Sequence, residues 1–357
     1  MQIGITLIVF ATIAGWVKRD SRVSCILVFA VMWILMGLNC HNDDFVGYQY
    51  FYDLKLMDYS GVNYGFLCLE QLCWSLGLNF IQFRMLSSFL GLGLLTLFVR
   101  RYSRDPSAVL VLYLLMPFFY DIVQFKFFLA ASFAIYGLRF LIDRTRLFLL
   151  KYFVFLCAAV LIHPAALLFG FFLIGLLDNK TALKVSLFVA LIALFLTVSG
   201  LGQVLGYALT DSVKGTAYFS VASRFGWIPY FVSTVGIVAV SHLSYSSMHD
   251  DVIGEDNDAP ARFEKFFSSA QYAFLPLIAF VPLSVQNFYR PIRSANILFL
   301  MHFVSIRFED SIKMARGEKA GLIILALLWI VFTQVILYKG VIDIVLVDEL
   351  TNNLLWA

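Results

Sequence analysis

Long apolar runs recur along almost the whole chain, and they restrict the possible fold more than any other feature. A transmembrane α-helix needs roughly 17 to 25 mostly apolar residues to cross a bilayer. Runs close to this length lie at 2–17, 22–39, 82–99, 106–120, 123–142, 147–162, 165–178, 183–200, 227–243, 269–285, 291–306 and 320–338. A soluble domain could not hide this surface, since 61% of the residues are hydrophobic and 14% are charged. We therefore predict an all-α polytopic integral membrane protein with about twelve transmembrane helices.

The predicted spans leave little room for other domains, so we expect residues 1–357 to form a single transmembrane domain. An outer loop is expected at 40–81. It includes "GFLCLEQLCWSLGLNF", which has one apolar face but is too short to cross comfortably, and which we interpret as an interfacial or re-entrant helix. A second outer loop is expected at 200–226 and a cytoplasmic loop at 244–267.

Lys and Arg residues are concentrated in alternate loops, and this sets the orientation. Eighteen of the 26 basic residues would share one side of the membrane: Lys18, Arg19, Arg22, Arg100, Arg101, Arg104, Arg139, Arg144, Arg146, Lys151, Lys180, Lys184, Arg262, Lys265, Arg307, Lys313, Arg316 and Lys319. By the positive-inside rule this side is cytoplasmic. Both termini and the acidic, tyrosine-rich segment "NDDFVGYQYFYD" (42–53) then face outward.

The other eight basic residues mostly fall at or just inside the outer ends of spans: Lys55, Arg84, Lys126, Lys214, Arg224, Arg290, Arg293 and Lys339. An ionisable group within a span costs about 2.5 to 3.5 kcal/mol on insertion scales, so several together indicate a function that needs them. The alternative for any single one is that it anchors a helix end.

These outer residues have a common chemistry. Arginine forks and lysine ammonium groups bind pyrophosphate and stabilise it as a leaving group. Acids and a histidine can remove a proton from a sugar hydroxyl. Tyrosines offer ring faces and hydroxyls to sugars. The set is typical of a site for a lipid-linked, pyrophosphate-activated glycan.

Four segments carry a resemblance to a known family: "NDDFVGYQYFYD", "YDIVQFKFFLAASFAIYGLRFL", "AAVLIHPAALLFG" and "NFYRPIRSANILFL". In these the chain resembles the EpsG-like, Wzy-type bacterial polysaccharide polymerases. The resemblance implies a GT-C-like architecture in the bacterial inner membrane, with the active site facing the periplasm or the outside. It implies an inverting glycosyltransferase that joins repeat units of capsule, O-antigen or exopolysaccharide, both carried on undecaprenyl pyrophosphate. Chain-length regulator and flippase proteins would be partners.

The outer residues and the resemblance together give the candidate site residues, among which Asp43, Asp44, Tyr48, His163, Arg290 and Arg293 match the family. The catalytic candidates are Asp43, Asp44 and His163, among which the sequence does not choose the general base. The pyrophosphate candidates are Arg290, Arg293, Lys126, Arg84 and Arg224. The glycan candidates are Tyr48, Tyr52, Gln124 and Tyr289. Lys126 and Phe127 depart from the family, which commonly has Arg followed by Gln there; lysine keeps the charge but loses the bidentate fork.

Each candidate has a structural alternative. His163 precedes Pro164 and could cap a helix, whereas Asp43 and Asp44 could be hydrated loop acids. Arg290 and Arg293 are three residues apart and would share a helix face once Pro291 had started that helix.

Other function classes lack support in the sequence. There is no P-loop, no GxGxxG and no zinc signature, so we expect no cofactor and no nucleic acid. A divalent metal on the first-loop acids is possible, although the basic residues make it unnecessary. A disulfide among Cys40, Cys68 and Cys73 is possible without an assignable pairing. A lipid-linked oligosaccharide flippase should show internal repeats, and a secondary transporter should carry an acid at mid-depth. An acyltransferase is a weaker alternative.

Overall fold

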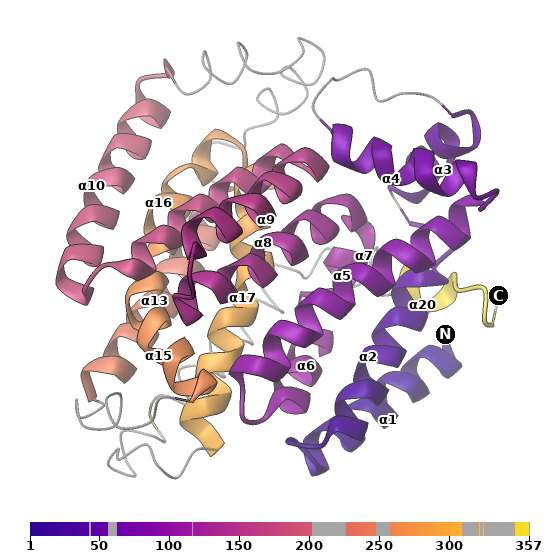
Figure 1. The fold of residues 1–357 in the computed structure, drawn as a ribbon, viewed down its shortest axis with the longest axis horizontal. Coiled ribbons are helices and arrows are strands. Elements are labelled where there is room, and N and C mark those ends of the chain that lie inside the picture. The colour runs from indigo at the N-terminus through magenta and orange to yellow at the C-terminus, as the bar shows by residue number, and fades with distance from the viewer. Residues whose placement is uncertain are drawn as a thin grey trace. The chain divides into compact units, whose positions relative to one another are not determined.

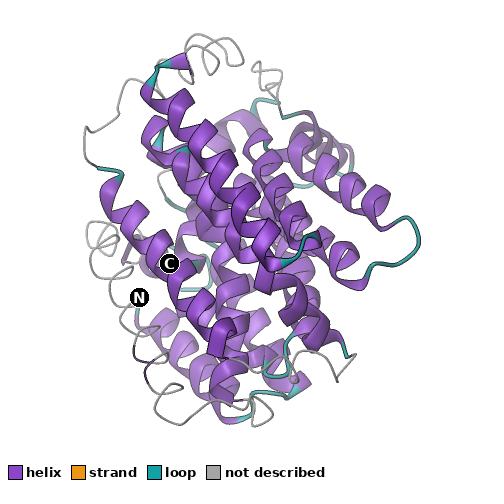
Figure 2. Cartoon of the chain, turned by 90° about the vertical axis from the view of Figure 1, so that its left-hand side faces the viewer, coloured by secondary structure: helices purple, strands orange, loops and turns teal. Residues whose placement is uncertain are grey.

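The computed structural model describes residues 1–42, 44–55, 63–115, 117–201, 226–247, 258–308, 321, 324 and 347–356. Every element in these ranges is a helix, and β pairing is limited to an isolated bridge between Asn39 and Asn353 (Figure 2). The all-α prediction is therefore confirmed for the described residues. The chain divides into two compact units: unit 1 comprises 1–139, 149–167 and 338–357, and unit 2 comprises 140–148 and 168–337. The single transmembrane domain stays a prediction.

Unit 1 contains the N-terminal helices and the C-terminal segment (Figure 1). Its elements are α1 (Gln2–Val17), α2 (Arg22–Gly37), α3 (Phe45–Asp53), α4 (Tyr64–Ser75), α5 (Phe80–Tyr102), α6 (Pro106–Leu115), α7 (Phe118–Val123), most of α8 (Phe125–Asp143), α9 (Phe148–Ile162) and α20 (Asp348–Thr351). Helix α2 packs against α1, α5 and α6. Unit 1 thus contains most of the elements that carry the candidate site residues.

Local sequence signals explain where several of these helices begin. Ser21 caps α2 by accepting a hydrogen bond from the Ser24 amide. Asn79 and Gln82 form a reciprocal capping box at the start of α5. The predicted span at 106–120 is interrupted, because α6 ends at Leu115 and Pro117 is the N-cap of α7. Proline cannot donate the backbone hydrogen bond that a continuous helix requires.

The C-terminal segment is tied to the end of α2. The Cys40 amide donates to the Asn352 carbonyl at 3.0 Å, and the Leu354 amide donates to the Leu38 carbonyl at 2.9 Å. The Asn353 side chain is buried and donates to the Ile34 carbonyl at 3.1 Å. These bonds hold the C-terminal segment against the last turn of α2.

Unit 2 is built from α10 (Asn179–Val198), α13 (Ile228–Ser247), α15 (Ala259–Ala270), η2 (Gln271–Ala273), α16 (Phe274–Ala279), η3 (Val281–Leu283) and α17 (Val285–Phe308). The 3₁₀ segment η1 (Pro164–Leu176) begins in unit 1 and continues in unit 2. At about 2.0 Å rise per residue, its 13 residues extend about 26 Å, farther than an α-helix of the same length. Helix α16 packs against α10, α13 and α17.

Helix α15 lies in the stretch that we expected to be a cytoplasmic loop. Asp258 caps it through the Ala261 amide, and Phe263, Phe266 and Phe267 are buried along one face. A side chain at Gly175 would place Cβ 2.4 Å from the Phe266 ring, so the absence of one allows η1 to contact α15 closely. Helix α13 also extends to Ser247, which leaves 248–257 outside the described residues.

Five helical stretches are long and apolar enough to cross a membrane: Phe80–Tyr102, Phe125–Asp143, Asn179–Val198, Ile228–Ser246 and Ala259–Leu283. Shorter apolar helices lie at Gln2–Val17, Arg22–Gly37, Pro106–Leu115, Phe148–Ile162 and Pro164–Leu176. These lengths and compositions indicate an integral membrane protein. The count of twelve remains a prediction, and most of the expected span at 320–338 lies outside the described residues.

Candidate functional site

Helices α3 and α4 meet through aromatic rings, and each carries an acid one turn away from the contact. The rings of Tyr48 and Phe66 are 6.2 Å apart between centroids. Asp44 precedes Tyr48 by four residues, and Glu70 follows Phe66 by four, so each acid shares a helix face with its aromatic partner. Asp44 is half-buried and Glu70 is buried. The contact thus has a carboxylate on either side.

A glycine brings α4 against the end of α9. A Cβ at Gly65 would lie 2.9 Å from both the backbone carbon and the Cβ of Leu161, and 3.1 Å from the Ile162 amide nitrogen. Only a residue without a side chain permits this approach. His163 follows these residues directly, so the contact holds the start of α4 near the segment that carries the histidine.

Lys126 lies in the first turn of α8 and completes the group. Its Nζ is 4.9 Å from the centroid of the Phe66 ring, and the residue is 9% exposed. A largely desolvated ammonium is attracted by an aromatic face, and the helix N-terminus adds a partial positive charge beside it. We define the outer cluster as Tyr48, Phe66, Glu70, Lys126 and His163. Its cation is the buried ammonium of Lys126, which lies against the Phe66 ring.

His163 contacts Phe127 with its ring and caps the segment that follows it. The two rings are 5.2 Å apart in an edge-to-face arrangement. The Ala165 amide donates to His163 Nδ1 at 3.2 Å. A neutral imidazole that accepts at Nδ1 carries its proton on Nε2. In this arrangement His163 can donate a hydrogen bond through Nε2, but it cannot take a proton there, which disfavours the predicted role as general base.

Arg84 is fully buried and joins the ends of two helices. Its Nε donates to the Met36 carbonyl at 2.8 Å, and its Nη2 donates to the Ile122 carbonyl at 3.0 Å and to Asn39 Oδ1 at 3.4 Å. Met36 and Ile122 lie in the last turns of α2 and α7, where carbonyls lack intrahelical donors and the helix dipole attracts a cation. These bonds give Arg84 a structural role, where we expected a pyrophosphate ligand.

Tyr52 is also used internally. Its ring is 3% exposed and stacks on Phe83, and its hydroxyl donates to the Leu78 carbonyl at 2.8 Å. Burial, with nearby negative charge from Cys73 and Glu70, raises the pKa of Tyr52 to about 12, so the hydroxyl stays protonated. Its position leaves almost no ring surface for the glycan contact that we predicted.

Gln124 lies at the break between α7 and α8. It is the C-cap of α7, and its carbonyl accepts from the Phe128 amide at 2.9 Å as α8 begins. The residue is half-buried. It therefore lies two residues from Lys126 in the same unit, and its predicted contact with glycan stays a prediction.

In unit 2 the candidates lie in the first three turns of α17. Tyr289 is buried with its ring 4.5 Å from that of Tyr230, Arg290 is half-buried and Arg293 is buried. Helix α17 begins at Val285, so Pro291 lies inside it, whereas we expected this proline to start the helix. The spacing still places both arginines near one another on the helix.

Two candidates, Asp43 and Arg224, lie outside the described residues, as does most of the predicted outer loop at 200–226. Within the described ranges, no group of three or more His, Cys, Asp or Glu side chains is arranged to hold a metal ion. All five cysteines are free thiols, so the suggested disulfide is absent from this structure.

Phe66 and Glu70 were not among the sequence candidates. Both lie in the segment 65–80 that the sequence predicts to be an interfacial or re-entrant helix, since it has one apolar face, carries Glu70 and Gln71 and is too short to span. The available signal was a buried acid four residues from an aromatic residue on a helix too short to span. The sequence could not show that Lys126, more than fifty residues later, lies over that ring.

Comparison with known proteins gives a family match over most of the chain. The EpsG family matches residues 22–343, a range that includes every candidate residue named above. No match is found among curated proteins, and none among solved structures. Since the family match extends through both units, the chain belongs to the EpsG family of membrane proteins, which is linked to exopolysaccharide biosynthesis.

Proposed function

We propose that the protein is an inverting glycosyltransferase that polymerises oligosaccharide repeat units carried on undecaprenyl pyrophosphate at the outer face of the bacterial inner membrane. The observation that carries the proposal is the outer cluster. In it the buried ammonium of Lys126 lies over Phe66, on the helix that also carries Glu70 and that packs against the end of α9 next to His163. Family membership supplies the link to polysaccharide synthesis.

The proposed reaction is a single displacement. A hydroxyl of the incoming repeat unit attacks the anomeric carbon of the growing glycan and forms the new glycosidic bond. The bond from that carbon to the pyrophosphate oxygen breaks with inversion, and the hydroxyl proton passes to a carboxylate. Because the donor is already activated, the reaction needs no nucleotide and no redox partner.

Lys126 has the chemistry to stabilise the leaving pyrophosphate. Negative charge grows on the bridging oxygen as the bond breaks, and an ammonium in a desolvated setting stabilises that charge more strongly than one in water. The N-terminus of α8 acts in the same direction. Arg290 and Arg293 remain proposed pyrophosphate ligands in unit 2.

The proton acceptor is proposed to be a carboxylate of α3 or α4. Asp44 lies one turn from Tyr48, whose half-buried ring can stack on a sugar, and Glu70 lies one turn from the buried Phe66 ring that contacts Tyr48. His163 is better suited to donate from Nε2 to a sugar or phosphate oxygen. The Glu70→Gln and Asp44→Asn variants, assayed in parallel, identify the base by the larger loss of rate.

A reconstituted assay tests the proposal. Purified protein in proteoliposomes receives the undecaprenyl pyrophosphate-linked repeat unit of its own host, and products are separated as a ladder on a gel. We expect a ladder with the native protein and a loss of about a hundredfold in rate for Lys126→Met. Lys151→Met changes an exposed lysine of α9 and is the matched control.

Two outcomes would contradict the proposal. One is the absence of a ladder together with movement of the intact lipid-linked unit between leaflets, which would identify a flippase. The other is a ladder that forms equally well with Lys126→Met, which would remove the outer cluster from the reaction.

A further inference from the structure

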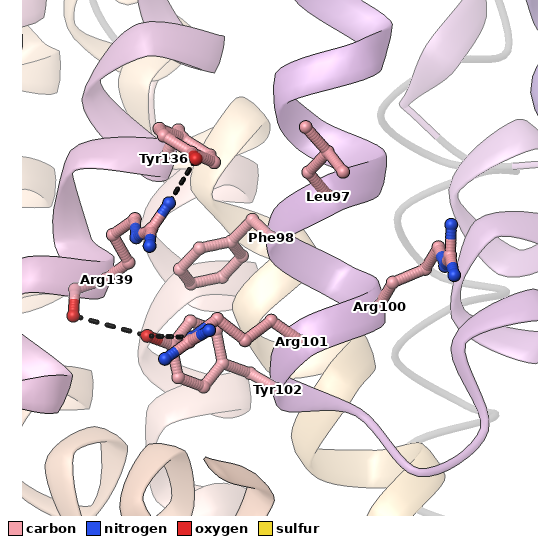
Figure 3. A pocket seen from close by; sticks show the side chains of 7 residues that line it. All are labelled: Leu97, Phe98, Arg100, Arg101, Tyr102, Tyr136 and Arg139. Atoms are coloured by element: carbon pink, nitrogen blue, oxygen red, sulfur yellow. Dashed lines mark hydrogen bonds between the residues drawn. The ribbon is translucent and has the colours of Figure 1, made fainter.

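A second group of cations lies at the other ends of α5 and α8, where the proposed reaction has no use for it. A cavity of about 340 Å³ opens there, lined by Leu97, Phe98, Arg100, Arg101, Tyr102, Tyr136 and Arg139 (Figure 3). All these residues belong to unit 1. Its volume is in the range typical of small-molecule sites.

Two tyrosines orient two of the arginines. Arg101 Nε donates to the Tyr102 hydroxyl at 3.2 Å, and that hydroxyl donates to the Arg139 carbonyl at 3.2 Å. Arg139 Nη1 donates to the Tyr136 hydroxyl. Each guanidinium also lies over its tyrosine ring, 5.6 Å from the centroid for Arg101 and 5.0 Å for Arg139. The two planar cations are thus held by stacking as well as by hydrogen bonds.

The arginines differ in direction. Figure 3 shows the guanidinium groups of Arg101 and Arg139 on the same side as the two tyrosines, whereas that of Arg100 points away from them. Arg101 is exposed and Arg139 is half-buried, so the pair borders solvent. The close packing of Gly91 against Phe128, where a Cβ would lie 2.7 Å from the ring, holds α5 and α8 together above the cavity.

The chemistry of this lining selects a phosphate group attached to an apolar body. A guanidinium offers a planar set of donors that matches phosphate oxygens, and tyrosine hydroxyls add further polar contacts. Leu97 is 53% exposed and offers apolar surface at the same place. By the distribution of Lys and Arg, this end of the helices faces the cytoplasmic leaflet, where basic pockets between helices bind anionic lipid headgroups.

We propose that this cavity is a binding site for the phosphate group of an anionic membrane lipid, with Arg101 and Arg139 as its ligands. The site is separate from the outer cluster, since it lies at the other end of α8 from Lys126. It does not depend on the proposed polymerase activity. A soluble phosphate could supply the same chemistry, so the test includes both sources.

Native mass spectrometry of the full chain in a neutral detergent measures the binding. The protein is titrated with phosphatidylglycerol, with zwitterionic phosphatidylcholine and with inorganic phosphate as a competitor. We expect one phosphatidylglycerol to bind more tightly than phosphatidylcholine and to resist competition by phosphate. Displacement by phosphate at equal concentration would keep the phosphate site but assign it to a soluble ligand.

Arginine variants locate the site. Arg101→Gln is expected to weaken phosphatidylglycerol binding about tenfold or more, because a charge-assisted bidentate contact is lost. Arg101→Lys keeps the charge and loses the bidentate fork, so its affinity for phosphatidylglycerol should lie between those of the native protein and Arg101→Gln. Arg104→Gln removes an exposed charge on the same side, outside the cavity lining, and should change binding less than about threefold, since a surface charge contributes only a general attraction.

Arg101 is exposed, so its substitution should leave the fold intact; Tyr136→Phe offers a second, charge-neutral change that removes a hydroxyl partner of Arg139. Equal losses for Arg101→Gln and Arg104→Gln would overturn the proposal, because they would show diffuse electrostatic attraction in place of a site. Equal binding of phosphatidylglycerol and phosphatidylcholine would overturn it as well.

Discussion

Helices α5 and α8 carry cations at both ends, and these cations are buried at the N-terminal ends but accessible to solvent at the C-terminal ends. At the N-terminal ends Arg84 is fully buried and Lys126 is 9% exposed, each against aromatic rings. At the C-terminal ends Arg101 is exposed and Arg139 is half-buried beside a cavity. A buried charge is costly unless it is compensated, so the N-terminal cations must be part of a fixed arrangement, whereas the C-terminal ones can exchange water for a ligand.

The comparison also separates Arg84 from Lys126. Arg84 donates to carbonyls at the ends of α2 and α7, so its guanidinium joins these helix ends. Lys126 lies over a ring at the edge of the outer segment, in the first turn of a helix. Two cations near the same end of unit 1 therefore have different expected effects, one on stability and one on the reaction.

The largest expected effect is on stability and concerns Arg84→Met. Removing the guanidinium leaves the buried carbonyls of Met36 and Ile122 without this donor, which should lower the free energy of unfolding by about 3 kcal/mol or more. Thermal unfolding in detergent, followed by intrinsic fluorescence, measures the change. Arg100→Met at the exposed end should cost less than about 0.5 kcal/mol. Equal losses for the two variants would remove the distinction between the helix ends.

A smaller effect is expected where α4 meets α9. Gly65→Ala places a Cβ 2.9 Å from a backbone atom of Leu161. A helix backbone cannot rotate away as a side chain can, so the clash must be relieved by a shift of α4 or α9. We expect a loss of about 1 to 3 kcal/mol in stability, together with slower polymerisation because Phe66 and Glu70 shift. The control is Gly93→Ala in α5, where nothing lies within 4 Å, and which should stabilise by about 0.5 to 1 kcal/mol. A fully active, stable Gly65→Ala protein would show that this contact does not position the outer cluster.

The role of His163 is tested by the pH dependence of the rate. If His163 donates from Nε2, then His163→Asn, whose amide can also donate, should lower the rate by about tenfold at most and leave the pH profile unchanged in shape. The measurement is the initial rate of ladder formation between pH 5 and pH 9. Loss of the acidic limb of the profile in the variant would instead identify His163 as the base.

The smallest effect concerns Asp178, the exposed N-cap of α10. Its hydrogen bonds to Thr181 lower the pKa of the carboxyl below the ordinary value of 3.8. The ionised form is therefore favoured by folding, and its stabilisation is present above pH 3.8 and is lost as the pH falls through the lower folded-state value. Asp178→Ala should lower the unfolding temperature slightly near neutral pH, and the difference from the native protein should become smaller in acid. A difference that persists unchanged in acid would exclude this cause.

Hydropathy predicted the helices well where each helix is stabilised by its own apolar length. The run at 82–99 lies within α5, and the run at 123–142 closely matches α8, because burial in lipid or protein depends on composition along one segment. Acids around the start of α15 made it resemble a loop, although Phe263, Phe266 and Phe267 recur at helical spacing. The helical spacing of these phenylalanines indicated a helix, but the nearby acids led to the prediction of a loop.

The candidate site was less predictable, because its roles depend on contacts between distant segments. The sequence showed that Arg84 and Lys126 stand at outer helix ends, but not that one binds carbonyls of α2 and α7 while the other lies over Phe66. The cap at His163 was recognised as an alternative, yet its consequence for the tautomer required the Ala165 contact. The type of a residue does not show which distant residue it will contact in the folded chain.

The most direct measurement compares Lys126→Met with Arg101→Gln in one reconstituted polymerisation assay, with ladder formation as the readout. We expect Lys126→Met to lower the rate about a hundredfold, and Arg101→Gln to polymerise within about threefold of the native rate in liposomes that are saturated with anionic lipid. If Lys126→Met polymerised at the native rate, or if both variants lost activity equally, the chemistry would not lie at the N-terminal ends of α5 and α8.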